Sequence, residues 1–155
     1  MKIYNSLLLV MAVFQVVLSQ NAEPKKIPIP KTYKELQTEL NTNGKVILYD
    51  IQFENNKAKL LSNSEPQIKE ISRLLNAYKK MKVYIVVHTD NTLEFEKTLE
   101  LSQEQAEAIR NELGDNYLVN IFQIIPKGVG PLSPLTSNTF EEGKKINRRV
   151  ELVLQ

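Results

Sequence analysis

Few side chains in this 155-residue chain have catalytic or metal-binding chemistry. The chain has one histidine, His88, and no cysteine. Nucleophilic catalysis needs a nucleophile, a base and a group that orients the base, and no serine lies in a G-x-S-x-G or S-x-x-K motif. Zinc takes three or four ligands, so a lone histidine predicts a structural role. The sequence therefore predicts a protein that is not an enzyme and has no metal and no cofactor.

Four other polar positions stand at the ends of predicted strands. Asp90 directly follows an apolar run, where an aspartate either binds a ligand or caps local backbone amides. Asn56 is the second of two asparagines after another strand, and a plain turn is an equal alternative there. Arg148 and Arg149 precede the last strand. We expect one of them, Arg149, to pair with an acid such as Glu151.

Gln105 has two readings. Together with Ser102, three residues earlier, it matches a capping box, in which both side chains bond to the first turn of a helix. That local role needs no ligand, and a binding role is the alternative. Ser64 and Gln67 form the same pattern before an earlier helix. Gly128-Val129-Gly130 lacks the third glycine of a dinucleotide-binding loop, so no such cofactor is expected.

Hydrophobic spacing predicts the elements that position these residues. The predicted elements are a helix over 32–40, a strand over 46–53 with Ile47, Tyr49, Ile51 and Phe53 on one side, a helix after Ser64, a strand over 83–87, a helix after Ser102 that ends at Gly114, a strand over 118–125, a loop over 127–134 and a strand over 149–154. The continuous apolar run over 83–87 predicts a strand covered on both faces. The predicted fold class is α+β: a sandwich of one mixed sheet with helices packed on one face.

Composition limits the possible partners. Lys plus Arg total 20 against 18 Asp plus Glu, a net charge of +2, and apolar residues make up 42%. These values predict one ordinary globular domain. Nucleic-acid binders usually carry a basic stripe, and none is visible here, so no nucleic-acid partner is expected.

The first 30 residues have the pattern of a targeting signal followed by a tether. Lys2 precedes an apolar run over 7–18, and Val17 and Ser19 stand at the positions that a signal peptidase reads. The run is shorter than the roughly 20 residues of a membrane span. We expect a signal peptide over 1–19 and a proline-rich tether over 20–30, followed by one domain over 31–155. After cleavage no transmembrane span is expected, and without cysteine the protein is not expected to be a lipoprotein.

Four segments, in this order along the chain, resemble the OmpA-like C-terminal domain family. They are Phe53–Ala58, His88-Thr89-Asp90 followed by Leu101-Ser102, Gly128-Val129-Gly130 with Pro134, and the closing segment Asn138–Val153. The resemblance covers about 46–154. It implies a βαβαβ-like sandwich with a pocket at one end of the sheet. It also implies non-covalent binding of peptidoglycan stem peptides through meso-diaminopimelate, in the periplasm or cell envelope, with other envelope proteins as further candidate partners.

The resemblance also implies site residues. In the family, an Asp of the H-T-D turn faces the ligand ammonium and an Arg fifteen residues later holds its carboxylate. Here the Asp is Asp90, but Gln105 replaces the Arg, which weakens that half of the clamp by about 1–3 kcal/mol. Leu93 replaces a family Gly, so the turn after Asp90 is expected to take another path. The expected peptidoglycan-binding residues are Asp90, Asn56, Gln105, Arg148 and Thr92. The alternative is a protein-interaction or scaffolding module whose pocket no longer binds.

Overall fold

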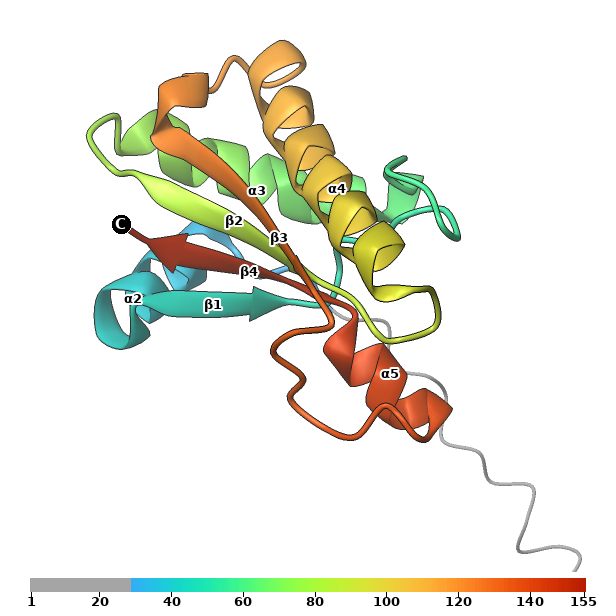
Figure 1. Cartoon of the computed structure of the whole chain (residues 1–155). Helices are drawn as coiled ribbons and strands as arrows, with labels where there is room; N and C mark the ends of the chain where they lie inside the picture. Colours follow the sequence, from blue (N-terminus) through green and yellow to red (C-terminus); the bar gives the residue numbers. More distant parts are fainter. Residues whose placement is uncertain (1–28) are drawn as a thin grey trace, which may run out of the picture.

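The computed structural model describes residues 29–155 (Figure 1). The expected signal peptide and residues 20–28 of the expected tether lie outside this range. In chain order the elements are α2 (Tyr33–Asn43), β1 (Lys45–Leu48), the 3₁₀ turn η1 (Ser62–Ser64), α3 (Glu65–Ala77), β2 (Val83–His88), α4 (Phe95–Asp115), the 3₁₀ turn η2 (Ile121–Gln123), β3 (Ile124–Gly130), α5 (Glu141–Asn147) and β4 (Arg149–Leu154).

The four strands form one mixed sheet in the order β1-β4-β2-β3. β4 is antiparallel to both β1 and β2, and β3 is parallel to β2. The last strand of the chain therefore lies in the interior of the sheet, between the first strand and β2. α4 connects the two neighbouring parallel strands, as a crossover helix must.

α2, α3 and α4 share one hydrophobic core with one face of the sheet. On β2, Val83, Ile85 and Val87 are buried and alternate with Tyr84 and Val86, which are half-buried. This alternation confirms the predicted α+β class with helices on one face. The predicted coverage of this strand on both faces holds only in part, because none of the three helices packs on the second face and Tyr84 and Val86 are only half-buried there. The core residues on the helices include Leu36, Leu40, Ile68, Ile71, Leu74, Leu75, Ala106, Ile109 and Leu113.

The predicted first strand has the wrong face and is too long. β1 ends at Leu48, and Val46 and Leu48 are buried while Ile47 is half-buried on the other side. Further along, Phe53 forms only an isolated bridge with Leu60. Alternation reports a period of two but not which set faces the core, and here the helices cover the even-numbered set.

Both predicted capping boxes are also wrong. The Ser64 hydroxyl accepts a bond from the amide of Gln52 (2.8 Å) and donates to its carbonyl (3.0 Å). α4 begins at Phe95, so Ser102 lies inside the helix and its hydroxyl donates to the carbonyl of Leu99. A pattern match for a cap cannot exclude a helix that extends further toward its N-terminus.

The strand predicted over 118–125 is replaced by a turn, η2 and the start of β3. Leu118 adopts a left-handed conformation (φ 55), which breaks the strand. β3 instead continues through Gly130, into the segment predicted as a loop. Gly114 does not end α4, which runs to Asp115; a Cβ on Gly114 would lie 2.6 Å from Cγ2 of Ile121. This glycine therefore permits close packing of η2 against the helix.

The G-x-G segment of β3 has a structural role. A Cβ on Gly128 would lie 2.1 Å from the backbone nitrogen of Gln103, so α4 lies directly against the strand. The amide of Gly128 donates to the Gln103 side chain (2.8 Å), and that of Gly130 donates to the Ser102 hydroxyl (3.0 Å). Side chains of α4 thus satisfy amides of an edge strand, which reduces its ability to pair with another chain.

Candidate functional site

Asp90 lies just beyond the end of β2 and is almost fully buried, with 6% of its surface exposed. One carboxylate oxygen accepts a bond from the amide of Thr92 (2.8 Å). The other oxygen is bound by the guanidinium of Arg148. Burial acts to raise the pKa of Asp90, but the bonds from Thr92 and Arg148 outweigh it and hold the pKa below its usual value. Asp90 is therefore an ionised acceptor that already has a partner.

Arg148 is the single residue between α5 and β4. Its side chain keeps 46% of its surface exposed, and Glu141 of α5 lies 3.9 Å from its second terminal nitrogen. The structure therefore brings Arg148 to Asp90 across 58 positions of sequence. Arg149 points elsewhere, and its Nε donates to Glu151 at 2.8 Å, which confirms the predicted pairing.

The segment that carries Arg148 is held in place by Asn147, which is fully buried. Its carboxamide oxygen accepts bonds from the amides of Leu135 (2.8 Å) and Thr136 (3.2 Å). Its nitrogen donates to the carbonyl of Thr136 and to the side chain of Asn138, both at 2.8 Å. Much of the closing segment therefore serves to fold the loop before β4. Sequence reasoning did not assign this role to Asn147.

Gly143 completes this packing. A Cβ on Gly143 would lie 1.9 Å from the carbonyl oxygen of Ser137, so α5 lies against the loop without room for any side chain. The loop and α5 therefore behave as one packed unit that positions Arg148 next to Asp90.

Two other expected site residues, Gln105 and Asn56, lie at a different contact, between α4 and the loop at Lys57. Gln105 is buried in the middle of α4, and its side-chain nitrogen donates to the carbonyl of Lys57 at 2.9 Å. Asn56, the residue before Lys57, is exposed and adopts a left-handed turn conformation (φ 54). Gln105 thus supports the loop that presents Asn56, and no hydrogen bond joins Gln105 to Asp90. No helix N-terminus lies at Gln105, because α4 begins ten residues earlier, at Phe95.

The turn after Asp90 tolerates Leu93 without strain. Among residues 29–155, the non-glycine residues with positive φ are Asn56 and Leu118, so Leu93 has an ordinary backbone. The Asp90–Thr92 bond forms an Asx turn, which a leucine at the following position does not prevent. Thr92 itself is exposed and contributes its amide to this turn.

His88 belongs to a buried charged cluster on the sheet face that α2, α3 and α4 leave uncovered. Glu151 binds Arg149, binds Lys45 at 3.0 Å, and lies 3.5 Å from Nε2 of His88. Neither ring nitrogen of His88 has a hydrogen-bond partner. Burial, and then the charge of Arg149, lowers the pKa of His88 to about 4 although Glu151 opposes the shift. His88 is therefore neutral near pH 7.

We expect this histidine to make the domain less stable in mild acid. Between pH 6.5 and about 4 the unfolded chain binds a proton at His88 that the folded chain does not bind. Unfolding is therefore favoured as the pH falls, by about 2 kcal/mol between pH 7 and pH 5. Urea unfolding at the two pH values measures the loss. His88→Gln should remove most of it, and an unchanged pH dependence in this variant would contradict the assignment.

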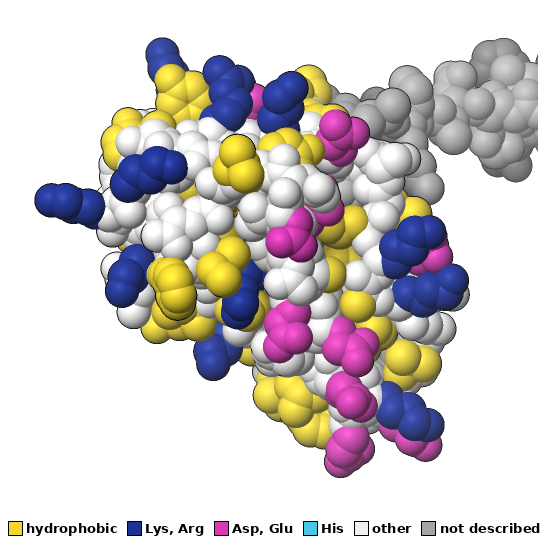
Figure 2. All heavy atoms as spheres, turned by 90° about the horizontal axis from the view of Figure 1, so that it is seen from above, with side chains coloured by type: hydrophobic (Ala, Val, Ile, Leu, Met, Phe, Trp, Pro, Cys, Tyr) yellow, Lys and Arg dark blue, Asp and Glu magenta, His cyan; other side chains and the backbone are white. Residues whose placement is uncertain are grey.

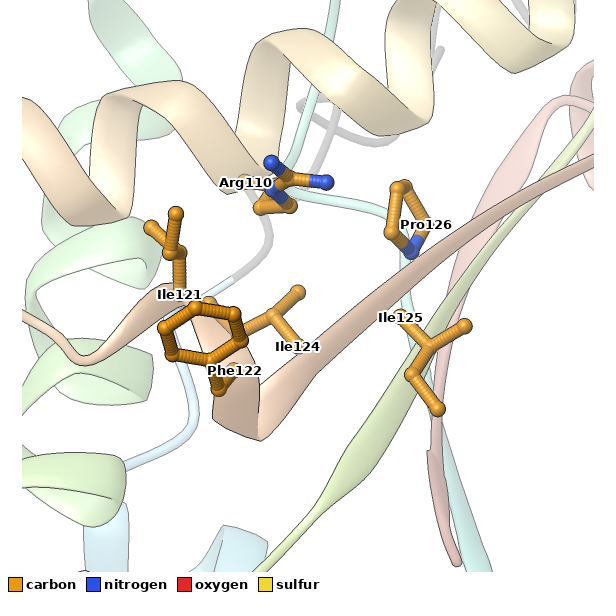
Figure 3. A pocket seen from close by; sticks show the side chains of 6 residues that line it. All are labelled: Arg110, Ile121, Phe122, Ile124, Ile125 and Pro126. Carbon is orange, nitrogen blue, oxygen red and sulfur yellow. The ribbon is translucent and has the colours of Figure 1, made fainter.

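Two surface hollows are formed by other residues. One, of about 290 Å³, is lined by Arg110, Ile121, Phe122, Ile124, Ile125 and Pro126 (Figure 3). The other, of about 450 Å³, lies between the start of α3 and the end of α4. Neither includes Asp90 among its lining residues. Within residues 29–155 no group of three or more His, Cys, Asp or Glu side chains could hold a metal, and no helix is long and apolar enough to cross a membrane.

Fold and site together define an α+β domain with a charged Asp–Arg pair at the end of its central strands. Residues 52–148 match the model of the OmpA family, and the chain belongs to this family. It is 31% identical over 102 residues to outer membrane porin F of Pseudomonas aeruginosa, which covers 66% of this chain and 29% of that protein. It is 32% identical over 136 residues to motility protein B of Bacillus subtilis, covering 84% and 52%.

A solved structure has the same fold. The peptidoglycan-associated lipoprotein from Burkholderia pseudomallei superposes with a TM-score of 0.61 at 23% identity, over 75% of this chain and 98% of that chain. The chain spans about half the length, or less, of the two curated relatives named above. One of these two relatives is named as an outer membrane protein and the other as a motility protein, so the role of this chain has to be argued from its site.

Proposed function

We propose that this domain is a non-enzymatic anchor of the cell envelope that binds peptidoglycan non-covalently, through the diaminopimelate of its stem peptides. The observation that carries the proposal is the Asp90–Arg148 pair. It sets one acceptor charge beside one donor fork, which is what a zwitterionic amino-acid group needs. Membership of the OmpA family and the likeness to a peptidoglycan-associated lipoprotein support it.

We further propose that binding proceeds by an exchange of partners at Asp90. Because Asp90 is buried and paired, a ligand ammonium reaches it only by replacing the guanidinium of Arg148. The displaced Arg148, which is half-exposed, is then free to bind the ligand carboxylate. In this exchange Arg148 becomes the donor to the ligand carboxylate. Gln105 cannot take this role, because it is uncharged and its side-chain nitrogen already donates to the carbonyl of Lys57. Asn56 and Thr92 line the approach as proposed secondary contacts.

A pull-down with purified peptidoglycan sacculi tests the proposal. The chain from Gln20 onward should be retained, and free meso-diaminopimelate should release it. Asp90→Asn keeps the size of the side chain but removes its charge, and should weaken retention about 10- to 100-fold. Asp115→Asn, an exposed residue at the end of α4, is the matched control and should bind like the wild type.

The outcomes distinguish whether the domain binds peptidoglycan at all from whether it binds through Asp90. If the unaltered chain is not retained, the domain is not a peptidoglycan binder, and an interaction module with a lapsed pocket becomes the better account. If Asp90→Asn and the control are retained equally, the domain binds the wall through other residues. Release by diaminopimelate specifically identifies the part of the stem peptide that is bound.

A further inference from the structure

The end of the domain opposite Asp90 carries a second distinctive surface. Asp90 lies beyond the end of β2, whereas Lys82 precedes its start, so a six-residue strand of about 20 Å separates the two ends. Three hydrogen bonds join the segments that form this opposite end. The Gln123 side chain donates to carbonyls of Tyr78 and Met81, and Asn76 donates to the carbonyl of Tyr117.

Unpaired cations concentrate at this end. Among residues 29–155, seven Lys and Arg side chains form no ion pair, and four of them lie here: Lys79, Lys80, Lys82 and Arg110. Three acids lie near the same end: Glu112 and Asp115 in the last turn of α4, and Glu65 beside Glu112 and Tyr117. Figure 2, which looks onto this end, shows basic side chains and apolar patches interspersed on one side and acidic side chains gathered on the other.

Large apolar side chains project from the same end. Leu118 is 83% exposed and Phe122 is 81% exposed, with Ile121 beside them at 39%. Such exposure of neighbouring large side chains marks an interaction surface rather than a solvated loop. Leu118 adopts a left-handed backbone (φ 55) in the cap that ends α4, where the amide of Val119 donates to the carbonyl of Leu113 at 3.1 Å, and its own side chain is left exposed.

Arg110 links the charged and apolar parts. It reaches from α4 over the hollow of about 290 Å³ whose walls include Ile121, Phe122 and Pro126 (Figure 3). Its Nε is buried and has no hydrogen-bond acceptor. The guanidinium also forms no ion pair, so an anionic group at the mouth of this apolar hollow would meet an uncompensated positive charge. The hollow does not suit an added β-strand, because Pro126 has no amide and α4 already binds the amide of Gly128.

We propose that this end, defined by Lys79, Lys80, Lys82, Arg110, Leu118 and Phe122, docks on a membrane surface that contains anionic phospholipid. The lysines meet the headgroup charge, Arg110 binds a phosphate oxygen, and Leu118 and Phe122 enter the interfacial layer. Protruding apolar side chains among unpaired lysines are the arrangement that interfacial binding uses. Because the Asp90 end lies on the other side, the domain can hold wall and membrane at once.

Vesicle co-sedimentation tests the proposal. The chain from Gln20 onward contains every described element and lacks the apolar residues 7–18, which would bind vesicles by themselves. It should bind vesicles of phosphatidylglycerol and phosphatidylethanolamine, release them in high salt and ignore vesicles of phosphatidylcholine. Replacing Lys79, Lys80 and Lys82 together with glutamine should lower partitioning about 100-fold, since each basic residue near such a surface contributes about fivefold.

Matched variants distinguish binding through this surface from binding that depends only on net charge or on exposed apolar residues anywhere on the domain. Lys34, Lys69 and Lys127 are the other three unpaired cations, and their triple glutamine variant has the same net charge. It should keep most of the binding. Leu118→Ser with Phe122→Ser should lower binding tenfold or more. Leu132→Ser with Phe140→Ser changes two exposed apolar residues outside this surface and should not.

Two results would overturn the proposal. One is failure of the unaltered chain to bind anionic vesicles, which would leave this surface to a protein partner. The other is an equal loss in the two lysine variants. Retention on sacculi is measured on the same preparations, so a failed membrane test does not bear on the wall-binding site.

Discussion

Gly128→Ala is expected to lower the free energy of unfolding by about 4 kcal/mol or more, a large part of the roughly 5–15 kcal/mol of a typical domain. The new Cβ would lie 2.1 Å from the nitrogen and 2.5 Å from the Cα of Gln103, and 2.4 Å from the carbonyl carbon of Ser102. These are backbone atoms, so no side-chain rotation relieves the overlap. α4 has to move away from β3 and give up two side-chain bonds to the strand.

Gly44→Ala is the matched control for this prediction. Gly44 has a left-handed backbone (φ 73), but nothing lies within 4 Å of a Cβ placed on it. Its replacement costs only conformational strain, about 1 kcal/mol. Urea unfolding of both variants measures the difference. Similar stabilities of the two variants would show that α4 does not lie on the strand as described.

Asn147→Ala is expected to cost about 3 kcal/mol, because it removes four hydrogen bonds at a fully buried position. The amides of Leu135 and Thr136 and the carbonyl of Thr136 lose their partner. The loop before α5 should loosen, and with it the placement of Arg148. Amide hydrogen exchange at Leu135 and Thr136 should accelerate more than exchange in β2.

Asn76→Ala is the control for an asparagine that makes fewer bonds at a half-buried position. The Asn76 side chain donates to the carbonyl of Tyr117 at 3.0 Å and accepts one bond from the exposed Lys79 at 2.6 Å. Its loss should cost about 1 kcal/mol. Uniform acceleration of exchange throughout the Asn147 variant would mean that the asparagine supports the whole domain and not this loop in particular.

The Asn147 prediction concerns how the residues of the closing segment divide between structure and binding. Asn147, Gly143 and Arg149 keep the loop, α5 and β4 in place, and Arg148 alone among these residues turns toward Asp90. A family signature can therefore be intact for structural reasons while the binding site differs. Gln105 in place of arginine is such a difference, since its amide now supports the loop at Lys57.

Much of the fold could be read from local sequence. The helices around Leu36 and Ile68, the strand over 149–154, the pairing of Arg149 with Glu151 and the α+β class all depend on spacing within one element or on neighbours in the chain. Hydrophobic period and chain order carry this information directly. The same signals misplaced the start of α4, because a capping pattern inside a helix looks the same as one at its beginning.

The site depended on contacts between distant segments. Local sequence placed Asp90 at the end of a strand and Arg148 before another, but only the insertion of β4 between β1 and β2 brings them together. Contacts between distant segments also determine which face of β1 is buried and how Gly128 fits against α4. A period along one element states how side chains alternate, whereas which atoms meet across elements is set by the packing of the whole core.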